Sequence, residues 1–206
     1  MVTENWRQER KSGIGAIAAS ILVSLILWFA LTRYLPPLKG MEDLGARMVV
    51  ALKCLALATL FCLVAGVESV AHERLQSAAF DPLAGHETRR LQVNLRYLQN
   101  TLEQIIVFAV GLFGLAAYLT DGSAMRAVPA VTIIWILNRF AFWIGYHRSA
   151  AMRGLGAPSM AVSLIVLLYV TARIGHDLAG TAGSVALIGV YLGIEAILFW
   201  STRRRA

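Results

Sequence analysis

The chain has 206 residues, of which 58% are hydrophobic and 15% charged, whereas soluble domains contain roughly 45–50% apolar and about 25% charged residues. The apolar residues gather in long runs without the alternation of a β-strand, and only helices or closed barrels satisfy backbone polar groups in lipid. The sequence therefore predicts an all-α integral membrane protein. We interpret its net charge of +7 as topological and not as a nucleic-acid-binding surface, because an excess of Lys and Arg orients membrane proteins.

Six apolar runs are long enough to cross a hydrocarbon core of about 30 Å. In chain order they are residues 13–34, 46–67, 97–120, 128–146, 158–174 and 180–200. The first run follows several basic residues, as in a signal peptide, but it is longer than an h-region and no small-residue cleavage site follows it, so we expect a retained span. The polar stretch 68–96 is the longest break and is expected to be a loop, except that its last part, from about Glu87, is expected to be helical and to continue into the third run.

Six crossings place both termini on the same side of the bilayer. Most of the 19 Lys and Arg residues then fall on that side, together with the stretch 68–96 and the segment 148–153. The positive-inside rule therefore predicts a multi-pass protein with both termini in the cytoplasm, and we expect it in a bacterial inner membrane.

Polar residues inside two of the runs share helix faces. In the third run Arg96, Asn100 and Glu103 fall at positions i, i+4 and i+7, which lie on one face of a helix. On the face of the fourth run and its continuation lie Arg139, Phe142, Tyr146 and Arg153. Ionisable residues inside a membrane are costly and usually face a bundle interior or a wet cavity. Both faces therefore become candidate sites.

Glu103 and Arg139 are expected at a similar depth, each on the order of 10 Å inside the cytoplasmic end of its helix. An ion pair between them would offset the desolvation cost of each charge. Two interpretations stay open. The pair could only hold two helices together, or it could belong to a polar pocket open to the cytoplasm. Several arginines suit an anionic ligand with carboxylates, because a guanidinium presents a rigid fork of donors.

The residues Arg96-Tyr-Leu-Gln-Asn100-Thr-Leu-Glu103 resemble the Arg-x-x-x-Asn-x-x-Glu signature that opens the second helix of the MAPEG family, the membrane-associated proteins in eicosanoid and glutathione metabolism. The segment 139–153, with its Gly-Tyr pair and two spaced arginines, resembles the end of that family's third helix. The resemblance implies a MAPEG-like four-helix bundle over residues 46–174. An additional transmembrane helix then lies at each end, in residues 1–45 and in residues 175–206, the latter with a basic cytoplasmic tail.

The family is trimeric and binds glutathione between neighbouring subunits. The resemblance therefore implies a homotrimer that takes glutathione and a lipophilic small molecule from the lipid bilayer. It gives Arg153 the catalytic role of stabilising the glutathione thiolate. The glutathione-binding residues that it implies are Arg74, Arg96, Asn100, Glu103, Tyr146 and Arg148. We add Arg139, the charged residue expected beside Glu103, to these candidates. No metal site is expected, because the histidines lack a ligand partner at helical spacing.

The chain departs from the family pattern at three positions. Gln104 replaces the tyrosine after the signature glutamate, Phe142 stands where some synthases carry tyrosine, and Leu98 occupies an often polar position. The leading hypothesis is a membrane-bound glutathione-dependent transferase or peroxidase that attacks a lipophilic electrophile or hydroperoxide. The alternatives are a non-catalytic member of the same fold that binds a lipid or a partner protein, and a small transporter subunit.

Overall fold

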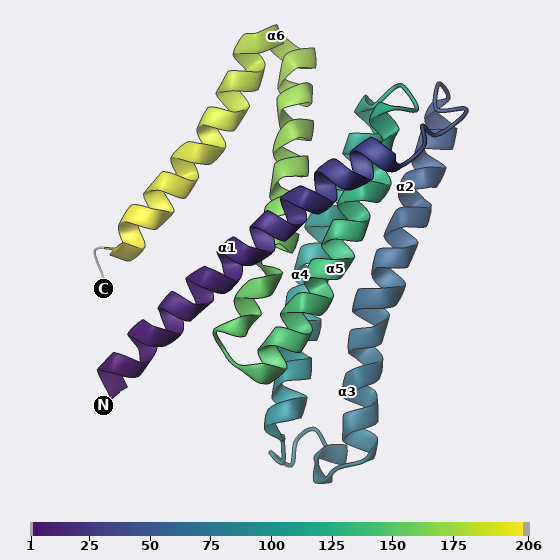
Figure 1. Ribbon diagram of the computed structural model, residues 1–206. Helices are drawn as coiled ribbons and strands as arrows, with labels where there is room; N and C mark the ends of the chain where they lie inside the picture. Colours follow the sequence, from purple (N-terminus) through teal and green to yellow (C-terminus); the bar gives the residue numbers. More distant parts are fainter. Residues whose placement is uncertain (1, 204–206) are drawn as a thin grey trace.

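The computed structural model describes residues 2–203, and the side chains of residues 8–203. Every regular element in this part of the chain is a helix (Figure 1). In chain order the elements are α1 (Val2–Tyr34), α2 (Leu44–Ala58), the π-helical η1 (Thr59–Val64), α3 (Ala65–Leu75), η2 (Ala78–Phe80), α4 (Arg89–Tyr118), η3 (Ala124–Arg126), α5 (Ala127–Arg148), η4 (Met152–Gly156) and α6 (Ala157–Arg203). Five helices are long and apolar enough to cross a membrane. The predicted all-helical, multi-pass membrane architecture is therefore confirmed.

Elements α2, η1 and α3 form one continuous helix that ends at Leu75. The prediction that the chain leaves the helix near residue 68 is therefore wrong. The segment 68–75 contains neither Gly nor Pro, and His72 Nε2 lies 3.5 Å from Glu68 Oε2 one turn earlier, a spacing that supports a helix. The expected helix from about Glu87 is confirmed, because α4 begins at Arg89, after Thr88 Oγ accepts the Leu91 N–H at 3.0 Å.

Helix α6 reverses direction within its 47 residues. Ala179 and Gly180 have non-helical backbone angles, and Gly180 adopts a φ of +60°, which glycine tolerates because it has no Cβ. The two arms, residues 157–178 and 181–203, meet at this turn and diverge away from it in Figure 1. Gly175 and Gly183 meet where the arms touch, and a Cβ on Gly175 would lie 2.6 Å from the Gly183 carbonyl oxygen. The sequence predicted two separate spans here, and the number of membrane crossings stays a prediction.

The core lies between α2, α4, α5 and the first arm of α6. The rings of Phe108 and Trp135 stack with their centroids 4.9 Å apart, and both side chains are fully buried. On α4, Gly111 and Gly114 allow a close approach of α6, since a Cβ on Gly114 would lie only 2.6 Å from Val170 Cγ1. Small residues bring membrane helices together in this way, because lipid supplies little hydrophobic driving force between them.

Helix α1 crosses the outside of this bundle obliquely (Figure 1). Near its start it packs on η4, where a Cβ on Gly154 would lie 2.8 Å from the Gly13 carbonyl oxygen. Further along, Asn138 Nδ2 of α5 donates a buried hydrogen bond of 2.9 Å to Ser24 Oγ. One close backbone approach and one buried hydrogen bond thus hold α1 against the other helices.

Candidate functional site

A polar cavity of about 470 Å³ opens between α4, α5 and η4. Five of the predicted site residues line it: Arg96, Asn100, Glu103, Tyr146 and Arg153. The remaining lining comes from Gln99, Gln104, Phe142, Gly154, Gly156 and Ala157. Two distant parts of the chain, α4 and the continuous segment from α5 to η4, therefore bring polar side chains to one place.

Polar side chains along α4 form a hydrogen-bonded row on the cavity wall. Arg96 Nη1 donates to Gln99 Oε1 at 3.2 Å, and Gln99 Nε2 donates to Glu103 Oε1 at 3.2 Å. Arg96, Gln99 and Glu103 are all exposed. The row leaves most donors of the Arg96 guanidinium and the second carboxylate oxygen of Glu103 available to a ligand, because a guanidinium has five N–H groups and a carboxylate two oxygens.

Close backbone packing folds η4 back onto α5 and so delivers Arg153 to the cavity. A Cβ on Gly156 would lie 2.1 Å from Phe142 Cβ, and a Cβ on Gly145 would lie 2.3 Å from the Met152 carbonyl oxygen. The guanidinium carbon of Arg153 lies 5.9 Å from the centre of the Tyr146 ring, within the range of a cation–π contact. Arg153 is exposed and lines the cavity, so its guanidinium is accessible to a ligand there.

Arg139 is fully buried behind the cavity wall. It donates to Asn100 Oδ1 at 2.9 Å and to Thr101 Oγ1 at 2.7 Å. Its guanidinium carbon lies 5.1 Å from the Tyr97 ring centre and 4.6 Å from that of Phe142. The charge is thus solvated by neutral oxygens and aromatic faces.

The predicted Glu103–Arg139 ion pair is wrong. Among the described side chains, Arg90 pairs with Glu73 and His72 lies near Glu68, and the Glu103 carboxylate accepts a hydrogen bond from Gln99 instead. On α4, Asn100 and Thr101 face α5, whereas Glu103 is exposed. Arg139 therefore donates to the α4 oxygens that face α5, whereas the Glu103 carboxylate lines the cavity.

The contact with Arg139 fixes the orientation of the Asn100 amide. Asn100 Oδ1 accepts from Arg139 Nη1 and also from Gln104 Nε2 at 3.1 Å. Gln104 is held in turn, since its Oε1 accepts a hydrogen bond of 2.8 Å from Ser159 Oγ. Because its oxygen is occupied, Asn100 presents its amide nitrogen, a donor, at the cavity wall.

The model of the MAPEG family matches residues 48–176 of the chain. The chain belongs to the MAPEG family. Among curated proteins and among solved structures, none matches the chain. The MAPEG match begins inside α2 and ends before the break in α6, so α1 and the second arm of α6 lie outside the matched region.

Besides the buried Arg139, two more predicted residues lie outside the cavity of this MAPEG protein. Arg148 is exposed at the end of α5, and Arg74 is half-buried near the end of α3. Neither lines the polar cavity. The Nε atom of Arg74 is buried without a hydrogen-bond partner among the described residues. A single chain therefore assembles only part of the site that the MAPEG resemblance implies.

The sequence reasoning missed several lining residues. Gln99 follows Arg96 by three positions and so lies on the same helix face, a spacing that could have identified it. Gln104 was interpreted only as a departure from the MAPEG pattern, although its amide links Asn100 to Ser159. No periodic signal marks Gly154 or Gly156, because their role is to let two backbones approach. Among the described residues, no group of three His, Cys, Asp or Glu side chains could hold a metal ion.

Proposed function

We propose that the protein is a membrane-bound glutathione-dependent transferase or peroxidase. The observation that supports this most strongly is the meeting of Arg96, Asn100, Glu103, Tyr146 and Arg153 around one cavity. These are residues that the MAPEG resemblance alone had assigned to glutathione. Their convergence from two distant parts of the chain is what a shared ligand requires.

The charges around the cavity fit the groups of glutathione. The tripeptide carries two carboxylates, one ammonium and one thiol. Arg96 and the amide nitrogen of Asn100 offer donors to a carboxylate, and Glu103 offers acceptors to the ammonium. Tyr146 adds a hydroxyl that both donates and accepts. We assign these four residues to binding and orientation.

Arg153 activates the thiol in this proposal. A thiol reacts as the thiolate, and its ordinary pKa is about 8.5. A guanidinium within hydrogen-bond reach favours the anion and lowers that pKa. Arginine keeps its own proton, so the thiol proton leaves to water at the open side of the cavity. The thiolate then forms a C–S bond with a lipophilic electrophile from the bilayer, whose departing or opened group takes a proton from water. With a hydroperoxide it attacks the outer oxygen, the O–O bond breaks and the alcohol leaves, and a second glutathione converts the sulfenic acid to the disulfide with release of water.

A homotrimer completes the site in the same proposal. The cavity is open in the single chain, and Arg74 and Arg148 lie outside it. A neighbouring subunit closes the open side, and these two arginines then act across the interface. The distribution of basic residues supports a cytoplasmic position for the cavity and both termini, and we propose that the membrane is a bacterial inner membrane.

Binding and turnover test this proposal separately. We expect glutathione to raise the unfolding temperature of the purified protein in detergent, because a ligand that binds only the folded state stabilises it. The change Arg96→Met should abolish that shift, and Arg33→Met, at an exposed arginine outside the polar cavity, is the matched control. Arg153→Leu should retain glutathione binding but lose conjugation of a generic electrophile. Undiminished conjugation by Arg153→Leu would remove Arg153 from the mechanism.

A non-catalytic role remains the second candidate, and one observation favours it. Phe142 lines the cavity and offers no hydroxyl where some MAPEG synthases carry a tyrosine. Such a member would bind a lipid or a partner protein without turnover. Glutathione binding without conjugation by the unaltered protein would select this function, and neither binding nor conjugation would favour a transporter subunit.

A further inference from the structure

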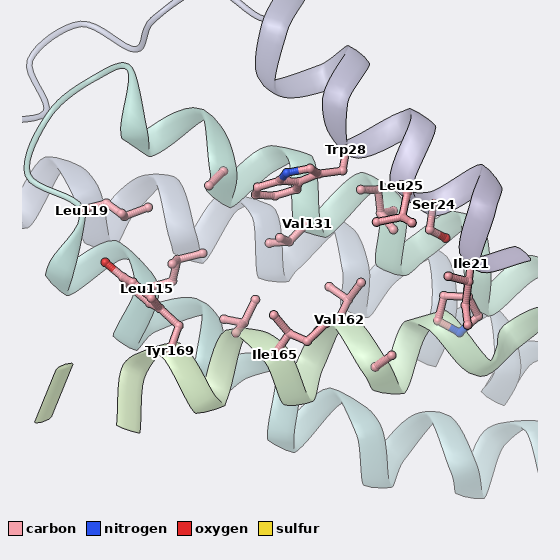
Figure 2. A pocket seen from close by; sticks show the side chains of 15 residues that line it. Ile21, Ser24, Leu25, Trp28, Leu115, Leu119, Val131, Val162, Ile165 and Tyr169 are labelled. Atoms are coloured by element: carbon pink, nitrogen blue, oxygen red, sulfur yellow. The ribbon is translucent and has the colours of Figure 1, made fainter. Parts of the chain in front are cut away.

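A second cavity, apolar and about 520 Å³ in volume, lies under helix α1. Its walls come from α1, α5, the first arm of α6 and the end of α4 with the adjoining Leu119. Figure 2 shows Ile21, Leu25 and Trp28 of α1 on one side of the space, with Val162, Ile165 and Tyr169 of α6 on the other. Pro158, the second residue of α6, closes it next to Ala157, which lines the polar cavity.

The path of α1 explains why this space exists. The helix touches η4 at Gly13 and is fastened to α5 at Ser24, and it crosses the bundle at an angle (Figure 1). A helix that is held at these points and tilted away from α6 leaves a wedge between the two. Since α1 lies outside the region that the MAPEG model matches, the cavity is a feature of the additional helix.

The chemistry of the lining decides what can occupy the wedge. Three of its side chains carry a polar atom, Ser24, Trp28 and Tyr169, and the Ser24 hydroxyl already accepts from Asn138. A buried water needs two to four polar partners, which an aliphatic wall does not provide. An empty space would forfeit the dispersion contacts of the side chains around it. Hydrocarbon is the medium that surrounds a membrane span, and it is the occupant that the lining favours.

We propose that this cavity binds one acyl chain of a membrane phospholipid. No charged side chain belongs to the lining, so nothing in the cavity recognises a free carboxylate, and the acyl chains of the surrounding phospholipid can enter while their headgroups stay at the membrane surface. An α-helix with its side chains is about 10–12 Å wide. The cavity volume instead lies in the range of roughly 300–1,000 Å³ of sites for small ligands. The proposal goes beyond the glutathione-dependent function and does not depend on it.

Photolabelling of the full chain in phosphatidylcholine vesicles tests the proposal. The probe is a phosphatidylcholine with a diazirine on one acyl chain, and mass spectrometry locates the adducts without glutathione present. We expect adducts concentrated on Ile21, Leu25, Val162 and Ile165, reduced by excess unlabelled phosphatidylcholine in the vesicles. Adducts spread evenly over all the lipid-facing helices would overturn the proposal. So would displacement by a saturated fatty acid but not by phosphatidylcholine.

Two matched pairs of variants separate the cavity from the outer surface. Ile21→Trp fills the cavity, and Leu22→Trp adds a similar side chain to the neighbouring exposed position outside it. We expect loss of the α6 adducts in the first and their retention in the second. Ala161→Leu against Met160→Leu repeats the comparison with a smaller change, and decides the test if Ile21→Trp does not fold. Equal labelling within a pair, or disulfide cross-links between copies carrying Leu25→Cys or Ile165→Cys, would show that lipid does not occupy the wedge.

Discussion

Arg139 donates a hydrogen bond of 2.9 Å to Asn100 Oδ1 from a position that is fully buried in the protein. The relationship joins α5 to α4 immediately behind the polar cavity. It also turns the donor end of the Asn100 amide toward the polar cavity. A buried charge without an acidic partner thus serves both packing and the geometry of the site.

Replacing Arg139 by methionine is expected to destabilise the fold. The change leaves the Asn100 and Thr101 oxygens without this donor, and a buried group that loses its partner costs about 1–3 kcal/mol. Unfolding in detergent measures the loss, and Arg33→Met, at an exposed arginine with no assigned contact, provides the control. Equal stability of Arg139→Met and the unaltered protein would contradict this role.

A methyl group at Gly156 is expected to displace η4 from α5. The added Cβ would lie 2.1 Å from Phe142 Cβ, so the backbone must move, and overpacking of this kind typically costs about 1–3 kcal/mol. Gly156→Ala should therefore unfold at a lower temperature and bind glutathione more weakly. At Gly189 a Cβ would meet open space, and Gly189→Ala should leave both measurements unchanged or raise stability slightly. A stable Gly156→Ala with full binding would refute the close packing.

Asn94 is expected to couple α4 to α5 through Trp143. The buried Asn94 Oδ1 accepts from Trp143 Nε1 at 2.9 Å and lies 2.9 Å from His147 Nε2. Asn94→Leu should cost about 1–3 kcal/mol, because the indole N–H then has no acceptor. The exposed Gln92→Leu is the control. The cost should shrink when Trp143 is already phenylalanine, and additive effects in that double-mutant cycle would count against the coupling.

Glu103→Gln is expected to weaken glutathione binding without loss of stability. Glu103 is exposed and bonded to Gln99, so its removal leaves no buried charge unpaired. A hydrogen bond to a charged group contributes about 1.5–3 kcal/mol, which corresponds to a roughly tenfold to hundredfold change in Kd. Calorimetry in detergent measures the Kd, with the exposed Glu195→Gln as the control. Unchanged affinity would separate Glu103 from the ligand.

Local periodicity predicted the α4 side of the cavity well. Arg96, Asn100 and Glu103 repeat at helical spacing, and a single helix suffices to place them on one face. The partner of Arg139 was not predictable in the same way. Its choice of Asn100 and Thr101 over Glu103 depends on how α4 and α5 are rotated against each other, which equal depth does not determine.

The close backbone contacts at glycines also could not be predicted from the sequence. Gly156 and Gly145 matter because another backbone lies against them, and this contact exists only once η4 has folded onto α5.

The segment 68–75 was assigned to a loop from its polarity, yet its residues are compatible with a helix that leaves the membrane. Polarity marks the edge of the bilayer there and not the end of the helix.

Gly180 controls the reach of the last part of the chain. As one straight rod, the 47 residues of α6 would extend about 70 Å at 1.5 Å per residue, more than twice the hydrocarbon thickness of about 30 Å. The reversal at this glycine divides that rod into two lengths that each match the bilayer. A residue that cannot adopt the φ of +60° found at Gly180 would oppose the turn. Arg203 would then lie far from the membrane face on which α6 starts.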